Sequence, residues 1–289
     1  MEDCGLDCGF KDAVPIRGLN PRSQSTIQSA IRSPQSAIEC RVHVLVTALG
    51  LSLLGSFGGF LVAATLVAFP ASVRTRLVPW LVSYAVGALL GVALLDLLPE
   101  ALSLLAPQAA FGTLLAGILL FFTLEKLVLL RHCHTHECEV HGATAPLLFI
   151  GNAFHNFIDG AIICAAVMSS VPLGINTAIA VAAHEIPQEV GDVAILLHAG
   201  YSRGRALLLN VVTGGSSLAG ALLAFGAVQV IPGIRPYVLA MSAASLLYIA
   251  MSDLIPNLHK GDTDGNALRQ VPLIAAGIGT IVLFERVIG

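Results

Sequence analysis

Long runs of apolar residues recur along this chain, and short polar stretches with turn-forming residues separate them. A helix needs about 20 mainly apolar residues to cross the hydrocarbon core of a bilayer. Eight runs meet that length, at residues 43–69, 77–98, 108–130, 146–168, 173–198, 205–230, 236–256 and 271–288. The pattern predicts an all-α fold, a polytopic membrane bundle of eight transmembrane helices.

The first part of the chain lacks this pattern. Residues 1–42 are polar, rich in Ser and Gln, and show no apolar period. Such a composition buries too little apolar surface to offset the entropy lost on ordering. We therefore expect a disordered N-terminal tail over 1–42 and a transmembrane domain over 43–289.

The composition agrees with a membrane location. Hydrophobic residues make up 56% of the 289 residues and charged residues only 11%, whereas a soluble domain usually carries about 25% charged residues. A net charge of −3 is too small to favour a nucleic-acid partner. The lipid bilayer is the expected surrounding of most of the surface.

The distribution of Lys and Arg predicts the orientation, because cytoplasmic loops carry an excess of both. An N-terminus outside the cell places seven of them in cytoplasmic loops and leaves Arg235 in a loop on the other side. The seven are Arg74, Arg76, Arg131, Arg203, Arg205, Lys260 and Arg269. Five basic residues in the tail argue the other way. We weight the loops, and predict a plasma (inner) membrane protein with both termini outside the cytoplasm.

Ionisable residues interrupt the fourth predicted span. The run His155-Asn156-Phe157-Ile158-Asp159-Gly160 lies in its middle. An ionisable side chain in hydrocarbon costs at least about 2.5 kcal/mol, so such groups indicate function. His155 and Asp159 are four residues apart and share one helix face. They are within reach of one ion.

The fifth predicted span carries a second polar run, His184-Glu185-Ile186-Pro187-Gln188-Glu189. It contains two neighbouring pairs with a spacing of four residues, one beginning at His184 and one at Glu185. Pro187 removes a backbone N–H and favours a kink. Irregular backbone inside a membrane is tolerated where it lines a polar passage.

Together these runs predict a metal site. The candidate metal residues are His155, Asn156, Asp159, His184, Glu185, Gln188 and Glu189. Imidazole with carboxylate suits Zn²⁺, and also Fe²⁺ or Mn²⁺, better than Ca²⁺ or Cu⁺. The alternative is a polar seam that only fastens the helices. Small residues would fasten them at lower cost, so we favour the metal site.

Further carboxylates lie near the ends of spans. Asp96 and Glu100 end the second span, and Asp253 ends the seventh. With the N-terminus outside, they would mark the outer mouth and the inner mouth of a pathway, in that order. The alternative is a carboxylate solvated by lipid headgroups. Asp192 follows Glu189 by three residues and is a candidate charge or proton partner in the same pathway.

The loop at 131–145, which the orientation places in the cytoplasm, is rich in metal-ligating residues. Its candidates are His132, Cys133, His134, His136, Cys138 and His141. This density is typical of metal binding, although the spacing matches no closed zinc motif. We expect a loop that captures or senses metal rather than a neutral linker.

Three of these motifs, HNFIDG at 155–160, HEIPQEVGDVAIL at 184–196 and DLLPEAL at 96–102, together resemble the ZIP family of metal-ion transporters. The resemblance is closest to the branch whose fifth span reads HExPHE. It implies eight helices, alternating access, homodimers, and transport of a divalent metal toward the cytoplasm. Zn²⁺ would be the cargo and not a catalytic cofactor, with Fe²⁺, Mn²⁺ or Cd²⁺ as alternatives.

The resemblance also implies ligand roles. His155, Asp159, His184 and Glu189 would be the primary ligands, between the fourth and fifth spans. Asn156 and Glu185 would form a secondary site that shares Glu189. Three positions depart from the family pattern: Gln188 replaces a His, Asp96 often is a His, and Ser217 stands near a Glu of binuclear relatives.

Two other classes of function compete with a carrier. An intramembrane zinc protease would use an HExxH helix, but Gln188 stands where that motif needs its second His. A metal-sensing receptor, or a proton-coupled carrier of another solute, would give no role to the buried metal-ligating motifs. We therefore expect a transporter and not an enzyme.

Overall fold

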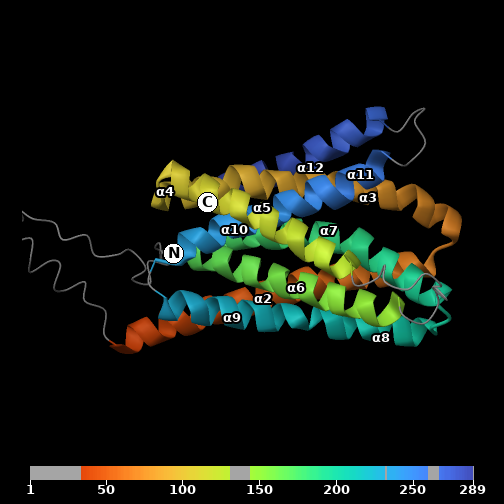
Figure 1. The fold of residues 1–289 in the computed structure, drawn as a ribbon, viewed down its shortest axis with the longest axis horizontal. Coiled ribbons are helices and arrows are strands. Elements are labelled where there is room, and N and C mark those ends of the chain that lie inside the picture. Colours follow the sequence, from red (N-terminus) through yellow and green to blue (C-terminus); the bar gives the residue numbers. More distant parts are fainter. Residues whose placement is uncertain (1–33, 131–143, 232, 260–266, 289) are drawn as a thin grey trace, which may run out of the picture.

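The computed structural model describes residues 34–130, 144–231, 233–259 and 267–288 (Figure 1). All regular structure in these ranges is helical, which confirms the all-α prediction. The first half contains α2 (Pro34–Ala68), α3 (Ala71–Gly91), the π-helical segment η1 (Val92–Leu97), α4 (Leu98–Leu104), α5 (Pro107–Leu130) and α6 (Thr144–Ser169). The second half contains α7 (Val171–His198), α8 (Arg203–Gly214), α9 (Ser216–Val230), α10 (Arg235–Tyr248), the π-helical segment η2 (Ile249–Leu254), α11 (Ile255–His259) and α12 (Ala267–Ile288).

The described helices agree with the eight predicted spans. Within the described ranges, seven helical stretches are long and apolar enough to cross a membrane. The helix α7 is not among them, because His184, Glu185 and Glu189 lower its mean hydropathy. Its 28 residues are nevertheless sufficient to span a bilayer. Figure 1 shows α7 running along the bundle with the other long helices.

The predicted boundary of the tail at residue 42 was wrong. The helix α2 already begins at Pro34, so 34–42 are helical. Proline is favoured in the first turn of a helix, where its missing N–H leaves no bond unmade. Residues 1–33, which make up the rest of the predicted tail, lie outside the described ranges.

Both ends of the described chain lie at the same end of the bundle. In Figure 1, α2 begins and α12 ends on the left, next to α4. The helices α3, α8 and α12 begin at the opposite end. An even number of crossings produces this arrangement. The predicted cytoplasmic loops therefore share one end of the bundle and the termini share the other.

Two π-helical segments carry two of the four predicted pathway acids. Asp96 lies in η1 and Asp253 in η2. Each acid is followed three residues later by a proline, Pro99 or Pro256. A proline ring collides with the carbonyl four residues earlier and leaves it without its helical donor. A widened π turn relieves that collision, and such turns are frequent at functional sites.

The helices pack in two groups. One group is held by the contacts of α2 with α7 and of α6 with α9, and the other by the contacts of α3 with α12 and of α5 with α10. The groups meet where α3 packs on α7, over a core that includes Leu89, Ile162 and Leu246. Figure 1 shows α2, α6 and α9 in the lower half of the view and α3 and α12 in the upper half, with α7 and α10 between them.

Glycines set the closest helix contacts. A Cβ at Gly220 of α9 would overlap the carbonyl oxygen of Phe157 in α6, and a Cβ at Gly160 of α6 would overlap that of Ser217. Gly87 and Gly277 play the same part between α3 and α12. Small residues let backbones touch, which is how membrane helices gain packing energy without a hydrophobic drive. The glycine that ends HNFIDG therefore fixes α6 against α9.

We predict that Gly220→Ala separates α6 from α9 and destabilises the fold by about 1–3 kcal/mol, the usual cost of overpacking. Thermal unfolding of the purified protein measures this as a lower midpoint. Gly226→Ala is the matched control, because it lies on the same helix and no heavy atom lies within 4 Å of its added Cβ. Equal midpoints for the two variants would contradict the glycine contact.

Candidate metal site

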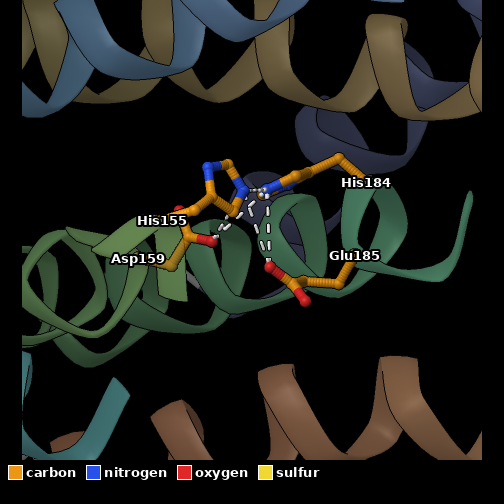
Figure 2. A group of neighbouring side chains, drawn as sticks. All are labelled: His155, Asp159, His184 and Glu185. Carbon is orange, nitrogen blue, oxygen red and sulfur yellow. Dashed lines mark hydrogen bonds and ion pairs between the residues drawn. The ribbon is translucent and has the colours of Figure 1, made fainter. Parts of the chain in front are cut away.

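The contact between α6 and α7 brings four metal-ligating side chains together (Figure 2). His155 and Asp159 come from α6, and His184 and Glu185 come from α7. Each offers one ligand atom, and all four atoms lie within 4.8 Å of one another. Asp159, His184 and Glu185 are at most 1% exposed, while the His155 side chain is 21% exposed. We call these residues the quartet.

The distances within the quartet match the size of a zinc ion. His155 Nε2 lies 3.0 Å from His184 Nε2 and 3.4 Å from Asp159 Oδ2. His184 Nε2 lies 3.3 Å from Asp159 Oδ2, and the Glu185 carboxylate is 3.6 and 4.0 Å from the two imidazoles. Zinc bonds of 2.0–2.1 Å in a tetrahedron separate neighbouring ligand atoms by about 3.3 Å. Small shifts of the side chains suffice to enclose the ion.

The quartet contains acceptors without donors. Both carboxylate oxygens of Asp159 and both of Glu185 are buried and have no hydrogen-bond partner among the described residues. Burying such groups without compensation is costly, and nearly all buried polar atoms in proteins have a partner. A cation bound between the four side chains would supply the missing interaction.

A backbone contact fixes the orientation of His184. Its Nδ1 donates to the carbonyl oxygen of Ala180 at 3.2 Å. Because a carbonyl can only accept, the proton is on Nδ1 and the lone pair of Nε2 faces the quartet. Metal-ligating histidines are commonly held in this way.

Two predicted metal residues belong to a neighbouring amide network. Gln188 Nε2 donates to Asn152 Oδ1 at 3.1 Å, and Asn156 Nδ2 donates to the same oxygen at 2.9 Å. Asn152 in turn donates to Thr213 Oγ1 at 3.2 Å. The network ties α6, α7 and α8 together beside the quartet. Asn152 was missed by sequence reasoning, since a neutral amide carries little cost in a polar seam.

Glu189 lies outside the quartet, and Glu185 occupies the position that the family resemblance gave to Glu189. Glu189 is buried, and Asn210 of α8 donates to its backbone carbonyl at 3.5 Å. Glu185 faces α2, where a Cβ at Gly59 would lie only 2.9 Å from the Cβ of Glu185. Ser217 donates its hydroxyl to the carbonyl of Gly214 at 2.8 Å.

A cavity of about 480 Å³ connects the quartet to one end of the bundle. His155 and Gln188 line it, together with the predicted pathway residues Asp192 and Asp253. Asp192 is buried, and its Oδ2 has no hydrogen-bond partner among the described residues. Glu125 also lines the cavity and accepts a hydrogen bond from the hydroxyl of Tyr248. The sequence pattern had not placed Glu125 on the pathway.

A second cavity, of about 760 Å³, lies at the end where α12 finishes. It contains the predicted pathway residues Asp96 and Glu100. No member of the quartet lines this cavity in the described chain. His155 of the quartet therefore borders the cavity that contains Asp253, and the cavity that contains Asp96 is a separate one.

The predicted loop ligands cannot be placed in this arrangement. His132, Cys133, His134, His136, Cys138 and His141 lie outside the described residues.

Comparison with known proteins finds relatives that are named as zinc transporters. A family model described as ZIP zinc transporter matches residues 129–285. Zinc transporter ZIP13 of Pongo abelii is 32% identical, over 89% of this chain and 89% of the relative. Zinc transporter ZIP13 of Homo sapiens is 30% identical over 89% and 90% of the two chains. Zinc transporter ZIP4 of Homo sapiens is 31% identical over 62% of this chain and 38% of the relative.

The geometry predicts that Glu185→Gln weakens zinc binding by about tenfold or more, which corresponds to about 1.4 kcal/mol. The neutral amide removes the charge that faces both imidazoles. Competition between the purified protein and a zinc-sensitive dye measures the affinity. Glu189→Gln is the comparison, because its carboxylate lies in the next turn of the same helix. A loss of affinity in Glu189→Gln alone would contradict the quartet.

Proposed function

Because this chain belongs to the ZIP family of zinc transporters, we propose that it moves divalent metal ions, zinc above all, across its membrane through the quartet of His155, Asp159, His184 and Glu185. The observation that carries this proposal is the convergence of four ligand atoms within 4.8 Å at the contact of two long helices. A closed structural site would need no route to solution. This cluster has one through the cavity of His155.

The pathway that we propose begins at Asp96 and Glu100 and ends at Asp253. The ion exchanges its water shell for the quartet and then leaves past Asp192. His155 is the most exposed ligand and lines the cavity toward Asp253. Water can therefore replace this imidazole first, so release is stepwise. Transport requires that binding be weak enough to leave.

Alternating access would arise from motion between the two helix groups. The quartet and both of its helices belong to the group of α2, α6, α7 and α9. Glycine contacts bind α6 rigidly to α9. Displacement of this group against α3 and α10 would close the cavity at Asp253 and open the quartet toward Asp96. The quartet itself would move without being taken apart.

The orientation, the membrane of residence and the oligomeric state belong to the same proposal. We propose the plasma membrane, both termini outside the cytoplasm, and a homodimer. The grouping of the Arg-bearing helix starts of α3, α8 and α12 at one end supports the orientation. Labelling of an introduced Cys in the tail of intact cells tests the orientation, and light scattering of the purified protein tests the dimer.

The protease alternative loses support from the geometry. An HExxH site takes both histidines from one helix. Here the second imidazole comes from His155 on α6, and Gln188 is bound to Asn152 instead. The relatives compared above are named as zinc transporters.

Deletion of the loop at 131–143 separates a carrier from a receptor, since a carrier keeps zinc flux.

We predict that Asp159→Ala combined with His184→Ala lowers zinc uptake into proteoliposomes by at least about tenfold, because half of the ligand set is lost. A zinc dye trapped inside the vesicles reports the initial rate. His43→Ala is the matched control, since His43 is an exposed histidine on α2. Undiminished uptake in the double variant would overturn the proposed function.

We also predict that uptake weakens as the external pH falls from about 7.5 to about 5.5, the range in which imidazole changes charge. Protons compete with the metal for the lone pairs of His155 and His184. The KM for zinc should rise more than the maximal rate falls. An uptake rate that increases with an inward proton gradient would instead make protons the driving force.

A further inference from the structure

The cavity at the Asp96 end contains more than the two acids found from the sequence. Asp96 and Glu100 line it from η1 and α4, Asn176 from α7, and Glu285 and Arg286 from α12. We propose that this cavity, which we call the vestibule, is a separate capture site for a divalent cation. Asp96 and Asn176 would hold the ion and Glu285 would complete the site. This inference rests on the proposed function for the identity of the ion.

Asp96 and Asn176 form a built pair of oxygen ligands. Their side chains are only 8% and 2% exposed. Asn176 Nδ2 donates to Asp96 Oδ2 at 2.9 Å, which aligns the two groups. The Oδ1 atoms of both residues are buried and have no hydrogen-bond partner among the described residues. A carboxylate and an amide oxygen left free beside a cavity are ligands that a hard divalent cation accepts.

The backbone around Asp96 gives the site its shape. Asp96 lies in the π turn of η1, which Pro99 forces open three residues later. Glu100 follows in the first turn of α4. Asn176 precedes His184 on α7 by eight residues, a rise of about 12 Å along the helix. An ion held at Asn176 is therefore on the way to the quartet but not in it.

Two charged residues of α12 line the vestibule and affect how strongly it would bind a cation. Glu285 is exposed near the end of α12 and interacts electrostatically with Asp96. Two carboxylates that repel each other across a cavity are stabilised by a cation between them. Arg286 lines the same cavity and opposes a cation. One opposing charge keeps the site weak, as a site that passes its ion on must be.

The charge pattern favours a cation over an anion. Three carboxylates and one guanidinium line the vestibule. The buried oxygens of Asp96 and Asn176 accept hydrogen bonds and cannot donate to an anion. The amide donors of Asn176 already face Asp96. The vestibule therefore concentrates metal at the entrance of the pathway.

Zinc uptake at varied zinc concentration tests the vestibule. We expect Glu285→Gln to raise the KM about three- to tenfold and to change the maximal rate less than about twofold, because capture and not passage is affected. Arg286→Gln should lower the KM by a similar factor. Glu39→Gln is the matched control, an exposed carboxylate at the same end of the bundle on α2. Its KM should equal that of the unmodified protein.

A binding experiment gives a second readout that does not depend on transport. With Asp159→Ala and His184→Ala disabling the quartet, the full chain should bind one more Zn²⁺ in a calorimetric titration than the same variant that also carries Asp96→Asn. Zinc held by the predicted loop ligands is common to both variants and does not affect the difference. Unchanged KM values for Glu285→Gln and Arg286→Gln, with flux intact, would overturn the vestibule and leave the proposed function standing. Absence of zinc flux in the unmodified protein would overturn the proposed function itself.

Discussion

The structure depends on the contact between α6 and α7, where carboxylates are buried without donors. Asp159 and Glu185 are expensive to place in an apolar bundle unless positive charge faces them. The two imidazoles alone do not remove this cost, because their Nε2 atoms lie 3.0 Å apart and pair with each other. In the proposed function, a divalent ion bound between the four side chains would supply the missing positive charge.

The glycine contacts hold in place the helices that carry these buried carboxylates. Gly160 and Gly220 bring the backbones of α6 and α9 together, so the helix that carries His155 and Asp159 is fixed on its outer side. Gly59 lets α2 approach Glu185 from a third direction. The quartet is therefore held by one rigid group of helices. The other group, of α3, α5, α10 and α12, supplies the surface against which that group can move.

The sequence predicted the spans and the polar runs, because apolar length and spacing of four residues are local properties. The family resemblance placed Glu189 among the primary ligands, whereas Glu185 is the carboxylate that lies in the quartet. The two carboxylates lie one turn apart on the same side of α7, and only the packing of α7 against α6 determines which of them lies beside His155 and Asp159. Asn152 and Asn176 escaped notice since neutral amides cost little to bury. Glu285 was not predicted because the role proposed for it depends on the packing of α12 beside η1, which no local pattern encodes.

The two mouths of the proposed pathway share one local feature of sequence and backbone. Asp96 with Pro99 and Asp253 with Pro256 each combine a carboxylate with a proline three residues later, in a π turn. A proline alone would kink the helix, and an acid alone would lie on a helix with all its backbone hydrogen bonds made. The two together place the acid on a widened π turn that borders a cavity. Each acid lines its own cavity at opposite ends of the bundle, so in the proposed pathway the two prolines lie where the ion would meet water.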